Sequence, residues 1–212
     1  MVSRKYDATG PEAESQPGSG GRVLRNLLGI TRVREINVAE TRALQTAMDR
    51  FVRRFDEQHR FTAADVRDMH RTWLGGIYEW AGEYRSVNMS KKDFPFAAAA
   101  RIPALTQDFE KDVLSRRTPC RFPRHKDLVE ALGEAHVELV LIHPFRDGNG
   151  RIARSLSILM ALQADLPLLD FSPFAGKRKT EYFAAIQAGM DLNYRPMARI
   201  FEELIEGSLA AT

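Results

Sequence analysis

The chain has 212 residues, 44% of them hydrophobic, which is enough for one good-sized core and makes a single compact domain the expected organisation. Lysine and arginine total 31 against 28 acidic residues, so the formal charge of only +3 excludes a strongly basic nucleic-acid tail. The single cysteine, Cys120, excludes an intrachain disulfide and suits a reducing cytosol. No apolar run is long enough for a membrane span or a secretory signal, so we expect a soluble, cytoplasmic protein.

Residues 1–21 differ in composition from the rest of the chain. They are rich in Gly, Pro, Ser and Glu and contain few large apolar side chains. Such a segment buries too little surface to offset its ordering entropy, so we predict a flexible N-terminal arm at 1–21 and one folded domain at 22–212. The apolar residues between 23 and 30 are expected to dock on that domain.

Two helices are expected in the first third of the domain. Apolar residues at helical spacing predict a helix over about 38–57, and Asn37 with Glu40 resembles a capping pair at its start. Thr62 and Asp65 repeat this signature before a second amphipathic helix, which Gly82 is expected to end.

The pattern changes between Tyr84 and Phe96, where polar and apolar residues alternate and a polar cluster at 90–93 resembles a turn. This predicts a short β-hairpin. Because the alternation covers only a few residues, an irregular surface loop remains the alternative.

Helical spacing returns over 102–114 and again over 128–140, with Pro119 and Pro123 between the two segments. Residues 152–166 are apolar nearly all round, which is typical of a helix buried on every side. Two more helices are expected, one over 182–190 and a final one that begins near Pro196. The fold class is therefore all-α, and His136, on the apolar face of its helix, is interpreted as a structural residue.

The stretch HPFRDGNGRIAR, from His143 to Arg154, carries most of the chemistry in the chain. Pro144 disfavours helical geometry at His143, so the preceding helix should end there and His143 should lead a loop. A histidine at such an exit can reach a cleft. Its pKa lies near neutrality, so it can accept a proton from an incoming hydroxyl group.

An anion site is predicted immediately after it. Gly148, Asn149 and Gly150 open into the buried helix, and glycines at a helix N-terminus let several N–H groups point into one concavity. Arg151 and Arg154 share a face in the first turn, where cations are disfavoured, so together they imply a compensating anion.

A polyphosphate fits this pair, because a guanidinium group can hold two phosphate oxygens at once. Asp147 can then hold Mg²⁺, which takes one or two carboxylates and completes its coordination with phosphate oxygens and water. These groups together predict a phosphoryl or nucleotidyl transfer site.

The motif resembles the signature of the Fic family, HPFx(D/E)GNGRxxR, and matches it at every specified place, with Arg146 at the variable one. More loosely, the resemblance extends from about Val23 to the end of the chain. It implies an all-α Fic fold, a helical bundle around a central helix-loop-helix with a short β-hairpin flap.

The activity that the resemblance implies is protein adenylyl transfer, in which AMP passes from ATP to a hydroxyl side chain of a target protein. His143 matches the general base and Asp147 the Mg²⁺ ligand. Gly148, Asn149, Gly150, Arg151 and Arg154 match the nucleotide-binding loop and arginines. In the family a flap pairs with an extended target segment, and the matching residues here are Ser86, Val87, Asn88, Met89, Lys91 and Phe96.

Many family members are silenced by a helix with Ser or Thr, three further residues, Glu, and then Gly or Asn. The only glutamate here that is followed by Gly or Asn is Glu206, and Glu202 stands where Ser or Thr is required. The chain therefore resembles a toxin that a separate small antitoxin protein carrying this pattern would inhibit, or the catalytic module of an effector injected into a host cell. Toxin-type relatives modify DNA gyrase and topoisomerase, which makes these enzymes candidate targets.

Two other functions stay open. Fic relatives also transfer phosphate, UMP or GMP, or remove AMP, although the intact GNGR favours AMP. A nucleic-acid-binding module is supported only by the Arg content, because no helix-turn-helix, zinc or RNA-binding motif occurs, so we expect no direct nucleic-acid partner.

Overall fold

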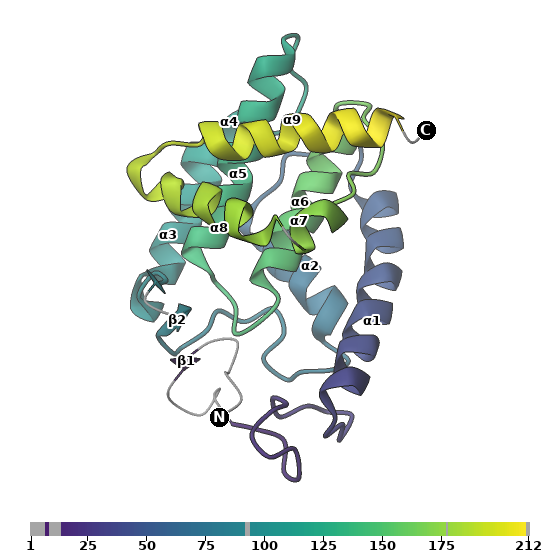
Figure 1. The fold of residues 1–212 in the computed structure, drawn as a ribbon, viewed down its shortest axis with the longest axis vertical. Helices are drawn as coiled ribbons and strands as arrows, with labels where there is room; N and C mark the ends of the chain where they lie inside the picture. The colour runs from purple at the N-terminus through teal and green to yellow at the C-terminus, as the bar shows by residue number, and fades with distance from the viewer. Residues whose placement is uncertain (1–6, 9–13, 92–93, 177, 211–212) are drawn as a thin grey trace.

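The computed structural model describes residues 7–8, 14–91, 94–176 and 178–210. Helices dominate, and Figure 1 shows them as a bundle with the N-terminal segment below it. In chain order the helices are α1 (Val33–Arg54), α2 (Ala63–Leu74), α3 (Ile102–Phe109), α4 (Ser115–Arg117), α5 (His125–Ile142), α6 (Asn149–Gln163), α7 (Ser172–Ala175), α8 (Lys179–Ala188) and α9 (Arg195–Ala210). Short 3₁₀ or π-helical segments, Ala99–Arg101, Glu110–Leu114 and Gly189–Asp191, adjoin α3 and α8.

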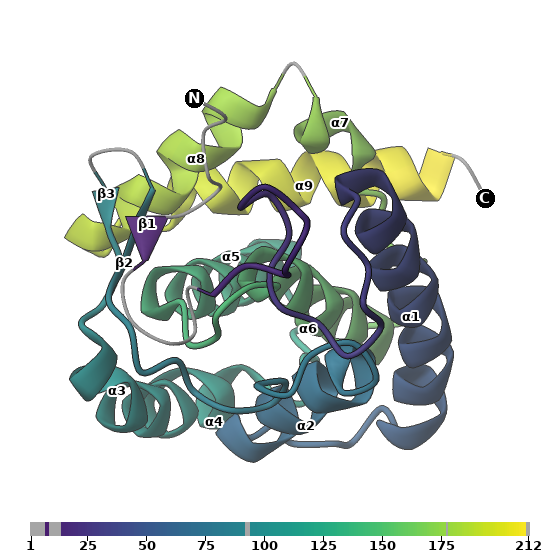
Figure 2. The same ribbon diagram turned by 90° about the horizontal axis from the view of Figure 1, so that it is seen from below.

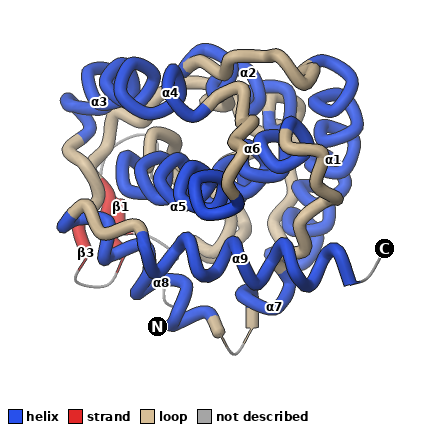
Figure 3. Tube along the Cα trace, turned by 90° about the horizontal axis from the view of Figure 1, so that it is seen from above, coloured by secondary structure: helices blue, strands red, loops and turns tan. Residues whose placement is uncertain are grey.

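Helix α5 lies at the centre of the bundle. In Figure 3 it is surrounded by α3, α4, α2, α6, α1, α9 and α8. Its sequence is apolar on most sides, and residues such as Ala131, Leu132 and Val137 are completely buried. The next helix, α6, is likewise buried on nearly every side, as its sequence predicts. The loop between these two helices is therefore anchored at both ends by helices that are buried on most sides.

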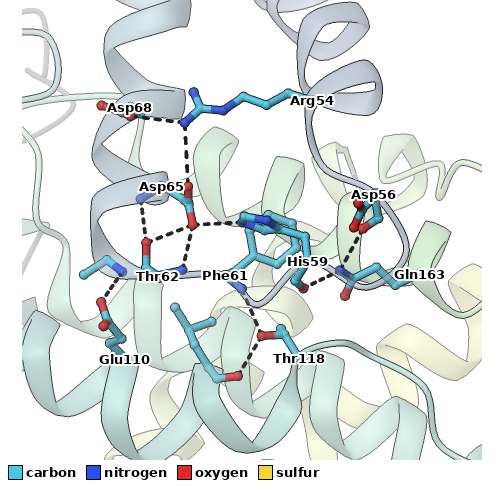
Figure 4. Close-up of polar contacts among 12 residues, drawn as sticks. Arg54, Asp56, His59, Phe61, Thr62, Asp65, Asp68, Glu110, Thr118 and Gln163 are labelled. Atoms are coloured by element: carbon cyan, nitrogen blue, oxygen red, sulfur yellow. Dashed lines mark hydrogen bonds and ion pairs between the residues drawn. The ribbon is translucent and has the colours of Figure 1, made fainter.

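Helix α2 begins at the predicted capping box. The Thr62 side chain accepts a hydrogen bond from the Asp65 N–H, and Asp65 accepts one from the Thr62 N–H. Figure 4 shows that the Asp65 carboxylate is also approached by His59 and by Arg54 at the end of α1. The box thus fixes both the start of α2 and the α1–α2 connection.

The expected boundaries of the first two helices are wrong in two places. Helix α1 starts at Val33, with Arg32 as its N-cap, so Asn37 lies inside the helix and no capping pair forms there. The Glu40 side chain instead turns inward to Tyr78. Helix α2 ends at Leu74, well before Gly82, because the glycine pair 75–76 weakens the helix and the chain then turns back.

The predicted hairpin is present as strands β2 (Met89–Lys91) and β3 (Phe94–Pro95), which pair antiparallel. A third strand, β1 (Asp7–Ala8), pairs with the other edge of β2, so the sheet order is β1-β2-β3. The predicted arm is described only at 7–8 and 14–21, and its residues 1–6 and 9–13 lie outside the described residues. Within the described ranges, no helix has both the length and the apolar character that crossing a membrane requires.

Candidate active site

His143 leaves helix α5 in a left-handed conformation, with φ 51° and ψ 57°, as the C-cap residue. Its ring stacks on Phe96 of the flap with ring centroids 3.6 Å apart. Nδ1 lies 3.1 Å from the Val140 carbonyl oxygen, which can only accept a hydrogen bond. In the neutral ring this places the proton on Nδ1 and the basic lone pair on Nε2, as proton acceptance requires.

Arg85 ties the flap to the motif loop. Its guanidinium is buried and donates to three carbonyl oxygens: Nε to His143 at 2.7 Å, and the terminal nitrogens to Val87 and Ala97 at 2.6 Å each. Its backbone N–H also donates to the Pro144 carbonyl oxygen. Arg85 was not predicted as a site residue, because nothing in the local sequence distinguishes it from an exposed strand arginine.

The second half of the loop rests on His70 from α2. His70 Nδ1 accepts the Gly82 N–H at 2.8 Å, so in the neutral ring Nε2 carries the proton and donates to the Asp147 carbonyl oxygen at 3.0 Å. Burial lowers the pKa of His70 to about 4, which keeps it neutral at physiological pH. The ring also stacks on Phe145, with centroids 3.9 Å apart. His70 was missed too, although its place between Val66 and Trp73 on the apolar face of α2 marks it as buried.

Gly148 is required for two separate reasons. Its φ of 87° lies in the left-handed region, and a Cβ atom there would lie 2.7 Å from the Trp73 ring and 3.2 Å from His70 Nε2. Gly150 meets nothing within 4 Å. The close contact of the loop with α2 therefore constrains the first glycine of GNG and not the second.

Asn149 holds the loop closed. Its side-chain oxygen accepts the Phe145 N–H at 2.8 Å, and its side-chain nitrogen donates to the Phe145 carbonyl oxygen at 2.7 Å. The residue is 1% exposed and, unlike its neighbours in the motif, does not line the cavity described below. Phe145 itself is completely buried, so it anchors the loop in the core.

Arg151 has carboxylate partners within the protein. It forms ion pairs with Glu40 from α1 and, at 3.6 Å, with Asp147, and its guanidinium lies 4.5 Å from the Trp73 ring centroid. Burial by itself lowers the pKa of Arg151, but the charges of Asp147 and Glu40 outweigh that effect and hold the pKa above its ordinary value. The inference that both arginines require an external anion is therefore too strong for Arg151.

Arg154 has a different environment. Its guanidinium lies 5.7 Å from the Phe171 ring centroid and 5.4 Å from that of Tyr182. Its Nε is buried and finds no hydrogen-bond partner in the described part of the chain. No described carboxylate forms an ion pair with it. At Arg154, a bound anion would supply the hydrogen-bond acceptor and the negative charge that the described residues do not provide.

These groups surround one open cavity of about 1290 Å³. Figure 2 views the α5–α6 loop from below, with the N-terminal segment passing in front of it. Six of the predicted site residues line the cavity in the motif, and Lys91 and Phe96 line it from the flap; the six are His143, Asp147, Gly148, Gly150, Arg151 and Arg154. The cavity is also lined by Arg22, Arg146 and Lys179, which were not predicted as site residues.

The other predicted flap residues do not line the cavity. Val87 and Met89 are buried and pack with Phe96 in a small cluster of their own. Ser86 and Asn88 are exposed on the opposite side of the alternation, and the Asn88 side chain accepts the Ala99 N–H at 2.9 Å. The flap therefore presents Lys91 and Phe96 to the site and uses its remaining residues to hold its own shape.

A metal ion here would depend on the nucleotide. Among the described residues, no three His, Cys, Asp or Glu side chains gather into a group that could hold a metal. Asp147 is the only carboxylate of the motif, and it lines the cavity beside the anion loop. One carboxylate fits Mg²⁺ when phosphate oxygens and water complete the shell, so the residues fit a nucleotide-borne Mg²⁺ and not a protein-only cage.

An all-α bundle whose central helix-loop-helix presents this motif to a cavity, beside a short hairpin, defines the Fic class of fold. Residues 60–161 match the model of the Fic/DOC family. This part of the chain is therefore similar to the Fic/DOC family.

Named relatives agree with this assignment. The chain is 29% identical over 170 residues to the protein adenylyltransferase VbhT of Bartonella schoenbuchensis, covering 76% of this chain and 33% of VbhT. It is also 29% identical over 145 residues to the probable protein adenylyltransferase Fic of Escherichia coli, covering 66% of this chain and 68% of that protein. The chain spans about a third of the length of VbhT.

A solved structure shows the same fold. The effector BepC of Bartonella tribocorum, determined with bound AMPPNP, matches with a TM-score of 0.70 at 23% identity, over 90% of this chain and 94% of that one.

Proposed function

We propose that this chain is a protein adenylyltransferase that moves AMP from ATP to a hydroxyl side chain of a target protein. The observation that carries the proposal is the single cavity shared by His143, Asp147, the glycine loop and Arg154, whose buried Nε has no described partner. A histidine base beside an anion-binding loop and an arginine suits nucleotidyl transfer. The names of VbhT and of the Escherichia coli relative support AMP as the transferred group.

In the proposed reaction, His143 Nε2 accepts the proton of the target hydroxyl group as its oxygen bonds to the α-phosphorus of ATP. The bond from the α-phosphorus to the bridging oxygen breaks, and pyrophosphate leaves. Backbone N–H groups at the start of α6 and the guanidinium groups of Arg151 and Arg154 stabilise the charge on the outer phosphates. Mg²⁺, held by Asp147 and the phosphates, would supply further charge neutralisation.

Target binding is assigned to the flap. An extended target segment is held by backbone pairing to a strand edge, while side-chain contacts select it. Residues 7–8 already pair with one edge of β2, and β3 pairs with the other. A target strand therefore either adds to the outer edge of β3 or displaces β1. Lys91 and Phe96, which face the cavity, are the side chains placed to contact it.

The test is transfer of label from ATP carrying ³²P at the α position, with Mg²⁺ and a bacterial lysate. Wild-type protein should label a small set of proteins, and His143→Ala should not. ATP labelled at the γ position should give no labelled protein, because that phosphate leaves with pyrophosphate. Labelling that persists in His143→Ala would remove His143 as the base.

The mass of the modified target separates the alternative transfers. An added AMP supports the proposal, whereas an added phosphate, UMP or GMP contradicts it and favours another reaction on the same fold. DNA gyrase and topoisomerase are the purified candidate targets to test first.

We further propose inhibition by a separate small protein, as in a toxin–antitoxin pair. Glu206, the nearest match to the inhibitory pattern, is exposed on α9 and does not line the cavity. Glu40 does line it but pairs with Arg151, and Ile36 stands where the pattern needs Ser or Thr. A peptide helix carrying the full pattern should inhibit labelling by the wild type. Unchanged labelling at saturating peptide would contradict inhibition through this pattern.

A further inference from the structure

We propose that Arg85 is a positioning residue that holds the target-binding flap and the His143 base at a fixed distance and angle to each other. This inference deepens the proposed function and rests on it. The observation behind it is one buried guanidinium group, 2% exposed, whose hydrogen bonds reach the backbone of the base and both stems of the flap.

The three described acceptors come from different segments of the chain. Val87 precedes β2 and Ala97 follows β3, so the terminal nitrogens of Arg85 donate to both stems of the hairpin, while Nε donates to the His143 carbonyl oxygen. A guanidinium group is planar and rigid, so its donors fix these carbonyl groups relative to one another. Buried hydrogen bonds from a charged donor are costly to lose, and the flap cannot move away from His143 without losing them.

At the base, Arg85 acts on the backbone that aims the histidine ring. His143 is a non-glycine residue in the left-handed region, with φ 51°, a conformation that persists only where its surroundings hold it. Arg85 supplies two of the contacts that hold it: Nε donates to the His143 carbonyl oxygen, and the backbone N–H donates to the Pro144 carbonyl oxygen at 2.9 Å. A single residue therefore fixes two consecutive peptide groups of the motif.

At the flap, the same guanidinium acts on the ring that covers the base. Phe96 immediately precedes Ala97, and its ring stacks on that of His143 with an angle of 17° between the planes. The Phe96 N–H donates to the Met89 carbonyl oxygen at 3.0 Å, which continues the pairing of the two flap segments. A shift of the Ala97 carbonyl group would therefore move Phe96 off the ring and carry the strand edge with it.

The consequence concerns the target hydroxyl group and not the nucleotide. Arg85 does not line the cavity, and the arginines assigned to the phosphates lie on α6. A target segment held along the flap meets His143 Nε2 correctly only if flap and base keep their spacing, and a misplacement of about 1 Å can cost a factor of about 10² in rate. Loss of the Arg85 contacts should therefore slow transfer and leave nucleotide binding unchanged.

The first experiment compares Arg85→Lys with Arg60→Lys. Lysine keeps the positive charge but replaces the planar fork by a single ammonium group, which cannot reach carbonyl groups from three segments at once. Arg60 is the matched control, because its guanidinium also donates to two backbone carbonyl oxygens, those of Ser115 and Thr118 at 3.2 Å each, but neither belongs to the flap or the motif. Label transfer from ATP carrying ³²P at the α position to lysate proteins gives the maximal rate and the KM for ATP, and calorimetry gives the ADP affinity.

We expect Arg85→Lys to lower the maximal rate by roughly 10²-fold with the KM for ATP and the ADP affinity unchanged, and Arg60→Lys to change none of the three. An unchanged rate, or ADP binding that falls together with the rate, would overturn the proposal. If the wild type transfers no AMP, the proposed function falls, and the two measurements that follow decide whether Arg85 holds flap and base together.

The second measurement is proton NMR of the His143 ring and needs no transfer activity. The stacked Phe96 ring shifts the His143 ring signals upfield, and Phe96→Leu gives their positions without that ring. We expect Arg85→Lys to move the signals toward the Phe96→Leu positions and Arg60→Lys to leave them in place. Signals that stay at the wild-type positions in Arg85→Lys would overturn the proposal.

The third measurement uses the wild type alone and does not depend on a variant that folds. Hydrogen exchange followed by NMR reports the protection of the Arg85 Nε–H and of the Phe96 backbone N–H. If Arg85 holds the flap, both groups are exposed by the same opening, so their protection factors should agree within about tenfold. A Phe96 N–H that is far less protected than the Arg85 Nε–H would show that the flap opens without Arg85, and the proposal would fall.

Discussion

The two arginines of the motif lie three residues apart on α6, yet the side chains that surround them differ in charge. On the α1 side, Arg151 meets Glu40 and Asp147, so its charge is compensated within the protein. On the α8 side, Arg154 meets the rings of Phe171 and Tyr182, neither of them charged. The comparison separates two environments that the sequence pattern combines: Arg151 lines the cavity while paired to Glu40 and Asp147, whereas Arg154 lines it without a described carboxylate partner.

The largest effect on activity should come from the α8 side. We expect Arg154→Ala to lower the rate of AMP transfer by about 10²- to 10³-fold, the usual cost of removing one charge-stabilising donor. The melting temperature should change little, because no described carboxylate loses a partner. Arg199→Ala, at an exposed position on α9, is the control and should leave both quantities unchanged. A large loss of stability in Arg154→Ala would contradict the proposed difference between the surroundings of Arg154 and those of Arg151.

The largest effect on stability should come from the α1 side. Arg151→Ala leaves Glu40, which is 5% exposed, without its cation, and we expect a loss of roughly 3 kcal/mol in the free energy of unfolding. Urea denaturation measures this loss. Adding Glu40→Gln to Arg151→Ala should recover part of it, because the uncompensated buried charge is then absent. No recovery would mean that the pair contributes little to folding.

The loop that both arginines share gives a third, smaller effect. Gly148→Ala forces a Cβ atom against Trp73 in a left-handed conformation, and we expect a loss of about 2 kcal/mol in unfolding free energy. Gly150→Ala is the matched control in the same motif. It meets nothing within 4 Å and lies in the first turn of α6, so a change of less than about 1 kcal/mol is expected. Equal losses in the two variants would contradict the close contact with α2.

Features set by short stretches of sequence are confirmed by the structure. The Thr62–Asp65 capping box, the end of α5 at His143 and the buried character of α6 follow from spacing, capping and the restriction before proline. Each depends on residues within a few positions of one another, where local rules are strongest.

Features set by distant residues could not be read in this way. Glu40 was interpreted as half of a helix cap, but it pairs with Arg151, 111 positions away. Arg85 reaches His143 over 58 positions and His70 reaches Asp147 over 77. Periodicity predicts which face of a helix is buried but not which polar partner a buried side chain finds there. For that reason the motif was predictable and its supporting residues were not.

The smallest effect concerns the surroundings of both arginines and is measured as the pH dependence of stability. A buried neutral histidine lies on each side. On the Arg151 side, His70 hydrogen-bonds the Asp147 carbonyl oxygen, and on the Arg154 side, His136 hydrogen-bonds the Tyr182 hydroxyl group. Burial lowers their pKa values from 6.5 to about 4 and about 3, so the unfolded chain binds protons that the folded protein does not. Stability is therefore fully present above pH 6.5 and falls as the pH drops toward those lower values.

At pH 6, we expect each histidine to reduce the free energy of unfolding by about 1 kcal/mol relative to pH 7.5, since one pKa unit corresponds to about 1.4 kcal/mol. Urea denaturation of the wild type at the two pH values measures the sum. His70→Gln and His136→Gln should each remove about half of the pH dependence, whatever they do to absolute stability. If either variant keeps the full dependence, that histidine binds a proton as readily in the folded as in the unfolded protein, and its assignment as a buried neutral residue is wrong.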